Sequence, residues 1–95
     1  MSQYTWVIVE TYAALGERSP REIRARPVPG QGLDTKMNVE CSGAMRNRYP
    51  AGTYIRLKAK VTDREGGPPF LYSYHGWPYE VLTKDQVEKL IRGRT

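Results

Sequence analysis

The residues best suited to chemistry in this sequence are basic, and they gather between Cys41 and Thr62. This segment contains no Asp or Glu, and its Lys and Arg residues are Arg46, Arg48, Arg56, Lys58 and Lys60. A guanidinium group binds phosphate through paired hydrogen bonds and stacks on aromatic rings or bases, whereas an ammonium group mainly adds point charge. Together with the net charge of +5, this block favours a polyanionic partner such as DNA or RNA.

Aromatic residues accompany the basic block. Small β-barrels bind nucleic-acid strands by combining a basic groove with exposed rings on which bases stack. Tyr54 precedes Arg56 by two residues, and Tyr72 and Tyr74 belong to the next run of apolar and aromatic residues. The pattern does not fix the register between the two runs. A solvated charged face beside buried tyrosines is therefore an equally open alternative.

Nucleic-acid binding without strong sequence preference is the function that this combination predicts. Arg56, Lys58 and Lys60 alternate with apolar residues along a strand, and all five cations of the basic block are expected to share one surface. The predicted contact residues are Arg46, Arg48, Tyr54, Arg56, Lys58, Lys60, Tyr72 and Tyr74.

A protein-interaction or homo-oligomeric assembly module is the alternative function. Residues 4–12 predict a strand with Val7 and Val9 on one face and Trp6 and Ile8 on the other. Apolar residues on both faces indicate that a helix or a second subunit covers the outer face. The predicted interface of a homodimer consists of Trp6, Ile8 and Tyr12.

Neither a catalytic nor a metal-binding group of residues is predicted. The chain has one His and one Cys, whereas structural zinc needs four nitrogen or sulfur ligands at close spacing. His75, oriented by Glu80 or a Tyr, could perform general acid–base catalysis, but a structural role for His75 at the end of a strand, before Gly76, is favoured. No phosphate-binding glycine loop is present. No cofactor and no enzymatic activity are therefore expected.

The clearest strand lies at residues 53–62, where apolar and polar residues alternate without interruption. Its apolar members are Ile55, Leu57, Ala59 and Val61. The Gly and Pro residues at 66–69 predict a turn. Residues 70–74 are then expected to return as a second strand, and residues 79–82 to form a third.

Two further strands are expected before this hairpin. Residues 19–27 combine a helix-start signal with the alternation of a strand, and the strand is favoured while the helix stays open. Residues 35–41 are predicted to form a strand with Cys41 on its buried face, followed by a connector over residues 42–52. As the single cysteine, Cys41 cannot form an internal disulfide, and an unreactive buried thiol is expected.

The C-terminal segment predicts a helix that docks on the sheet. Thr83 and Gln86 have the spacing of a capping box, and Leu82 and Val87 that of a hydrophobic staple. The stripe expected to face inward consists of Val87, Leu90 and Ile91. A helix of about ten residues is too short to be stable alone, so it has to pack on the strands.

These elements predict a mainly β protein with one C-terminal α-helix, in a single domain of residues 1–95. Several short strands between Gly and Pro turns favour a small, strongly bent antiparallel β-barrel of the Src-homology-three type. An open antiparallel α+β sheet with the helix across one side is the alternative. No apolar run approaches the ~20 residues of a membrane helix. No membrane partner is therefore predicted, and a cytoplasmic location is expected.

Three stretches in the C-terminal half also carry a resemblance. The runs at residues 49–56, 62–66 and 77–81 read Tyr-Pro-Ala-Gly-Thr-Tyr-Ile-Arg, Thr-Asp-Arg-Glu-Gly and Trp-Pro-Tyr-Glu-Val. They resemble small uncharacterised proteins carried by mobile gene cassettes of the integron type. The resemblance implies a compact single-domain protein and supplies no catalytic residues for this chain.

Overall fold

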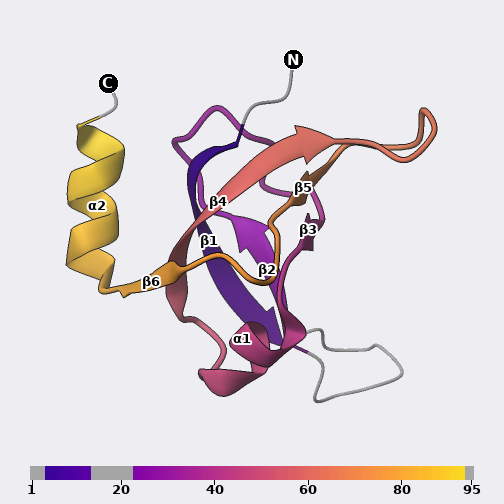
Figure 1. Cartoon of the computed structure of the whole chain (residues 1–95). Coiled ribbons are helices and arrows are strands. Elements are labelled where there is room, and N and C mark those ends of the chain that lie inside the picture. The colour runs from indigo at the N-terminus through magenta and orange to yellow at the C-terminus, as the bar shows by residue number, and fades with distance from the viewer. Residues whose placement is uncertain (1–3, 14–22, 94–95) are drawn as a thin grey trace.

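The computed structural model describes residues 4–13 and 23–93. This part of the chain forms a six-stranded sheet and two helices (Figure 1). In chain order they are β1 (Thr5–Ala13), β2 (Ile23–Pro27), β3 (Val39–Glu40), α1 (Gly43–Arg48), β4 (Tyr54–Thr62), β5 (Phe70–Tyr72), β6 (Tyr79–Leu82) and α2 (Lys84–Arg92). Neither described helix is long and apolar enough to cross a bilayer.

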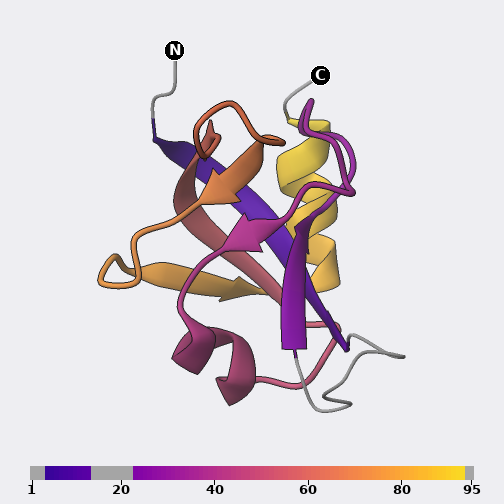
Figure 2. The ribbon, with the colours of Figure 1, turned by 90° about the vertical axis from the view of Figure 1, so that its right-hand side faces the viewer.

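Strand β4 is the centre of the sheet. It pairs along one edge with β1, and its other edge is shared by β6 and β5, all antiparallel. The order β2-β1-β4-β5-β3 then curls until β2 and β3 approach each other, as Figure 2 shows. The result is a nearly closed, barrel-like sheet with a C-terminal helix. The prediction of a small, strongly bent β-barrel is confirmed, and the alternative of an open antiparallel sheet is wrong.

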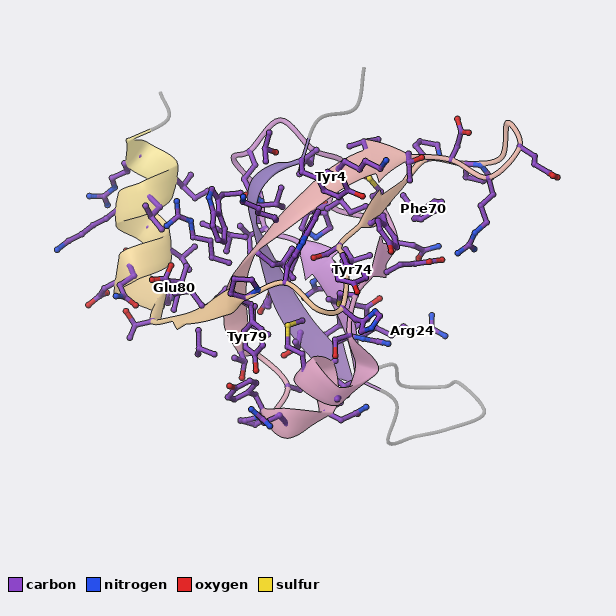
Figure 3. The ribbon with its side chains drawn as sticks, in the orientation of Figure 1. Tyr4, Arg24, Phe70, Tyr74, Tyr79 and Glu80 are labelled. Atoms are coloured by element: carbon purple, nitrogen blue, oxygen red, sulfur yellow. The ribbon has the colours of Figure 1, made fainter. Side chains whose placement is uncertain are left out.

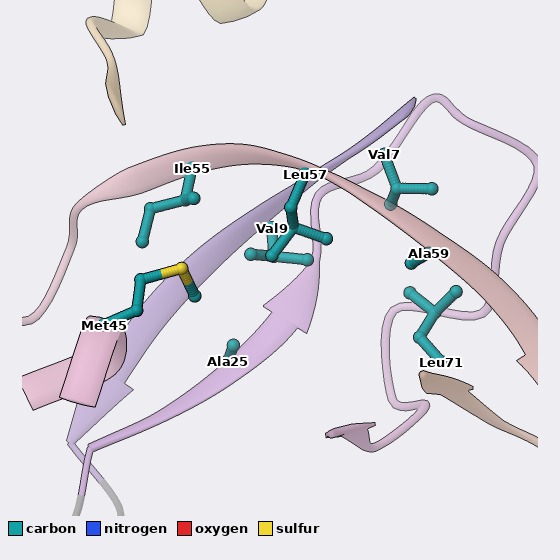
Figure 4. Packing of buried hydrophobic residues seen from close by; sticks show 8 residues of the cluster. All are labelled: Val7, Val9, Ala25, Met45, Ile55, Leu57, Ala59 and Leu71. Atoms are coloured by element: carbon teal, nitrogen blue, oxygen red, sulfur yellow. The ribbon is translucent and has the colours of Figure 1, made fainter. Parts of the chain in front are cut away.

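The inside of the barrel holds the main core, which Figure 4 shows from close by. Its buried members are Val7, Val9, Ala25, Met45, Ile55, Leu57, Ala59 and Leu71. Alternate side chains of a strand point to opposite faces, so the predicted apolar residues of β4 reach this core together. Ile55 and Ala59 have no exposed surface. Met45 of α1 packs against the same core, so α1 covers one end of the barrel.

Helix α2 covers part of the outer face of the sheet and forms a second core there. Its buried members are Val87 of α2 itself and, beneath the helix, Ile8, Val28 and Leu82. Thr83 caps the helix, and its hydroxyl oxygen accepts from the Gln86 amide while the Gln86 side chain accepts from the Thr83 amide. The predicted helix, its capping box and its inward stripe are confirmed, because Leu90 and Ile91 also pack on this cluster.

The loop after β2 fits closely between β1 and α2. Gln31 accepts a hydrogen bond from the Ile8 amide at 2.8 Å and donates to the Ile8 carbonyl oxygen at 2.9 Å, so its amide takes the place of a strand partner. Gly30 has a φ of 95°, and a Cβ there would lie 2.5 Å from Cγ2 of Ile91. Only glycine allows this close approach without strain. The loop therefore fixes α2 against β1.

Some elements differ from the predictions. Residues 42–52 contain α1, which starts where the Ser42 hydroxyl oxygen accepts a hydrogen bond from the Met45 amide at 3.1 Å. The strand expected over residues 35–41 is limited to β3, because Asp34 forms a local turn by accepting from the Lys36 amide at 2.8 Å. β3 also pairs parallel with β5, so the sheet is mixed.

The crossover through α1 and β4 supplies the long connection that parallel pairing needs. Within residues 19–27, the strand is confirmed over Ile23–Pro27. Residues 19–22 lie outside the described part of the chain.

The second core gives a test of helix docking. Ile8 is 1% exposed beneath α2, so Ile8→Ala should lower the free energy of unfolding by about 2–5 kcal/mol. Chemical denaturation followed by circular dichroism measures this loss. Val81→Ala is the control, because Val81 is 44% exposed on β6 and its truncation should cost no more than about 0.5 kcal/mol.

The same measurement separates burial within the chain from burial against a second copy. If Ile8 is buried by α2, the loss of stability from Ile8→Ala is the same at low and high protein concentration. A loss that grows with protein concentration would mean that a second copy covers Ile8.

Candidate nucleic-acid interface

The strand register decides which side chains share the outer face of the sheet. Residues directly opposite each other in a ladder point to the same side. Lys58 lies opposite Trp6 on β1, and Lys60 lies opposite Tyr72 on β5. Tyr72 therefore shares a face with the predicted cations, which resolves the register that the sequence left open.

Helix α2 leaves part of this outer face uncovered, and the exposed part is aromatic and basic. We call this surface the open face. Its residues are Tyr4, Trp6, Arg56, Lys58, Lys60, Tyr72, Tyr74 and Trp77. Tyr4 and Trp6 are each 38% exposed and Tyr74 is 44% exposed. Large rings with this much accessible surface are able to contact a ligand without any rearrangement of the core.

The cations of the open face lie over its rings. The Arg56 guanidinium is 5.0 Å from the centre of the Trp6 ring, and the Lys58 ammonium is 5.7 Å from it. The Lys60 ammonium lies 5.0 Å from the centre of the Tyr4 ring. These cation–π contacts hold positive charge and ring surface side by side. Among the described residues, neither Lys58 nor Lys60 has an ion-pair partner.

Rings from distant segments form a row across the open face. The Tyr4 and Trp77 rings meet edge to face with their centres 4.5 Å apart, and Trp77 and Tyr74 meet in the same way at 5.7 Å. The His75 ring extends the row, with its centre 4.7 Å from the centre of the Tyr74 ring. In Figure 3, Tyr4 and Tyr74 lie near each other, whereas Tyr79 lies toward α1. The loop between β5 and β6 thus brings two rings beside β1.

In the described part of the chain, two acidic side chains border this surface: Glu40 of β3, which lies opposite Tyr72 and forms an ion pair with Arg64, and Glu80 of β6. Glu80 of β6 lies opposite Arg56, and its carboxylate accepts from the Arg56 guanidinium at 3.4 Å. Both side chains are accessible to water, at 34% for Arg56 and 59% for Glu80, so the pair is weak. Part of the charge of Arg56 is therefore neutralised in the free protein.

The structure does not bring all the predicted contact residues together. Arg46 lies on α1, where its guanidinium donates to the Ile23 carbonyl oxygen at 2.8 Å. Arg48 is exposed beside Tyr49 and Tyr79, and hydrogen bonding to Tyr49 raises the pKa of its guanidinium. Tyr79 belongs to the opposite face, because it pairs with Leu57. The expectation that all five cations share one surface is therefore wrong for Arg46 and Arg48.

Tyr54 also lies away from the open face. It points outward like Arg56, but it packs against the cluster under α2, opposite Leu82 of β6. The helix thus covers the Tyr54 ring, which the sequence assigned to base stacking.

The residues predicted for a homodimer interface have separate surroundings. Ile8 is covered within the chain by Val28 and α2, so it offers no surface to a second copy. Trp6 belongs to the open face. Tyr12 is half-buried, with the Arg26 guanidinium 4.8 Å from the centre of its ring. The helix is one of the two covers expected for this strand.

Two residues of the open face were missed by the sequence predictions. Tyr4 has the same parity as Trp6 on β1, and this alternation is a signal that could have placed it. Trp77 lies in a loop with no periodic pattern, so only the tertiary contact with Tyr4 assigns it. In the part of the chain that the structure describes, no three His, Cys, Asp or Glu side chains are grouped as a metal site.

Comparison with known proteins adds no assignment. No protein-family model, curated protein or solved structure matches this chain.

The reactivity of Cys41 is a test of the packing around α1. Cys41 is half-buried against the main core, and burial raises the pKa of its thiol. A raised pKa lowers the fraction of reactive thiolate at neutral pH. Alkylation at neutral pH should therefore be much slower in native buffer than in denaturant, measured by mass spectrometry. Equal rates in both conditions would contradict this packing.

Proposed function

We propose that this protein binds nucleic acid without strong sequence preference, through the open face of its sheet. The observation that carries the proposal is the placement of Arg56, Lys58 and Lys60 over exposed rings on the half of the outer face that α2 leaves uncovered. A nucleotide presents the complementary pair of groups, a flat base and a phosphate.

The two kinds of contact contribute in different ways. Stacking of a base on an aromatic ring contributes about 1–3 kcal/mol and tolerates every base, because each base has a π-face. Contacts of Lys and Arg with phosphate release counterions and are also independent of sequence. Lys58 and Lys60 need not break an ion pair among the described residues to make them.

Intrinsic fluorescence gives a direct binding assay. The chain contains two Trp residues, and both Trp6 and Trp77 lie on the open face. Titration with an unlabelled oligonucleotide of about twelve nucleotides at low salt should therefore change the tryptophan emission as the complex forms. Light scattering on the free protein tests the alternative, an assembly module, in which the open face is occupied by another copy.

Charge removal should weaken binding only where the charge lies on the open face. The double variant Lys58→Ala/Lys60→Ala should lower affinity and flatten the log–log salt dependence by about 1.4 for a single strand, at roughly 0.7 for each phosphate that is no longer neutralised. Labelled-oligonucleotide anisotropy at several salt concentrations measures both quantities.

Arg48→Ala is the control for this removal of charge. It takes away one positive charge at α1, beside Tyr49 and Tyr79, and should leave affinity and salt dependence nearly unchanged. An effect of Arg48→Ala about half as large as that of Lys58→Ala/Lys60→Ala, in proportion to the charge removed, would mean that net charge, rather than the open face, drives binding. Absence of binding by the wild-type chain at low salt would end the proposal.

Removal of the acidic neighbour should strengthen binding. Glu80→Gln removes the carboxylate that competes with phosphate for Arg56, so affinity for a single strand should rise, while the salt slope changes little because the same three cations contact phosphate in both proteins. Anisotropy titrations are again the measurement. Glu88→Gln is the matched control, since it removes the same charge from α2, where Glu88 lines a different groove, with Glu10 and Tyr54. A gain shared equally by both variants would exclude a local role for Glu80.

A further inference from the structure

We infer that the ligand of the open face is single-stranded, and that its bases stack on the row of rings formed by Tyr4, Trp77 and Tyr74 and on Trp6 beside it. The inference rests on the proposed function and specifies its substrate class. It follows from three properties of the surface: the balance of rings and charges, the arrangement of the rings, and the support of the loop that carries two of them.

The balance of groups disfavours a duplex. The open face has five aromatic side chains and three cations, and Glu80 partly neutralises Arg56. Proteins that bind duplex DNA through its phosphates make many such contacts, and their affinity depends steeply on salt. A surface with more rings than cations gains most from a ligand whose bases are exposed.

The arrangement of the rings also requires unpaired bases. Tyr4, Trp77 and Tyr74 meet edge to face, so neighbouring rings turn their flat sides in different directions. A base can lie against such a ring only after it has left the stack of its own strand, which a single strand allows at low cost and a duplex does not. Rings in several orientations therefore suit a flexible strand.

Cations and rings are close enough to serve the same nucleotide. Lys60 lies over the ring of Tyr4, and Arg56 and Lys58 lie over the ring of Trp6. A nucleotide whose base contacts one of these rings consequently has its phosphate within reach of a cation. This pairing of groups is repeated on Tyr4 and on Trp6, which gives successive nucleotides equivalent sites.

The loop that carries Tyr74 and Trp77 is held in place by a glycine. The Trp77 amide donates to the Tyr74 carbonyl oxygen at 3.2 Å, which closes a turn around Gly76. A Cβ at Gly76 would lie 2.5 Å from Cε2 of Tyr74. The Tyr74 ring thus lies directly over the glycine, in the space that a side chain would fill. Gly76→Ala should displace this ring without removing an aromatic group or a charge.

The test compares single and double strands of the same length. Anisotropy titrations with labelled oligo-dT of about twelve nucleotides and with a blunt duplex of the same length should give an affinity at least tenfold higher for the single strand at equal salt. The slope of log affinity against log salt for the single strand should lie near −2, from three phosphate contacts at about 0.7 each.

Ring variants test the row itself. Trp6→Ala and Gly76→Ala should each weaken single-strand binding several-fold while the salt slope stays within about 0.3 of wild type, because all three cations still reach phosphate. Trp6→Phe keeps a ring at the same place and should restore most of the affinity. Thermal melting of each variant checks that the fold is intact. Val81→Ala serves as the control, because Val81 is exposed on β6 opposite Ile55, a residue of the inner face, and its truncation removes neither a ring nor a charge.

The outcomes separate this inference from the proposed function. Duplex affinity equal to or above single-strand affinity would overturn the single-strand inference and leave nucleic-acid binding intact. Ring variants that flatten the salt slope as much as Lys58→Ala/Lys60→Ala would overturn the stacking role. No binding of either oligonucleotide would overturn the inference and the proposed function together.

Discussion

The pairing of β4 with β1 is the contact on which the rest of the structure depends. The two strands are covered on both sides, by the main core within the barrel and by α2 on part of the outside. Val9 and Ile55, opposite each other in the ladder, have no exposed surface. If β4 slipped by one residue along β1, its inward and outward side chains would exchange faces. Burial of the inner residues therefore fixes the register of the two strands and, with it, the residues that point outward.

Helix α2 is short and covers only part of the outer face of this strand pair. The helix has nine residues and packs on Ile8 and Tyr54, whereas Trp6 lies outside this cluster, with Arg56 and Lys58 over its ring. The covered half contributes to stability through burial of apolar surface. On the uncovered half, rings and cations stay at the surface. Aromatic side chains of this size would ordinarily pack into a core. This division is the structural basis of the proposed function.

The loop between β5 and β6 completes the open face. Strands β5 and β6 both pair with β4, and the chain between them folds back so that Trp77 reaches Tyr4, next to β1. Gly76 makes this return compact by leaving room for the Tyr74 ring. The loop therefore joins residues from opposite ends of the sequence into one surface, and a scaffold of paired strands holds it in place.

The sequence by itself determined the elements whose signals are local. The alternation over residues 53–62 predicted β4 and its two faces, and the capping box at Thr83 predicted α2. Both signals depend only on residues a few positions apart in the sequence. The tertiary structure alone decided the rest. Helix α2 covers Tyr54, α1 carries Arg46 away from the sheet face, and a long-range contact adds Trp77 to it. Those outcomes depend on which side chains bury each other in the folded protein, and these side chains are far apart in the sequence.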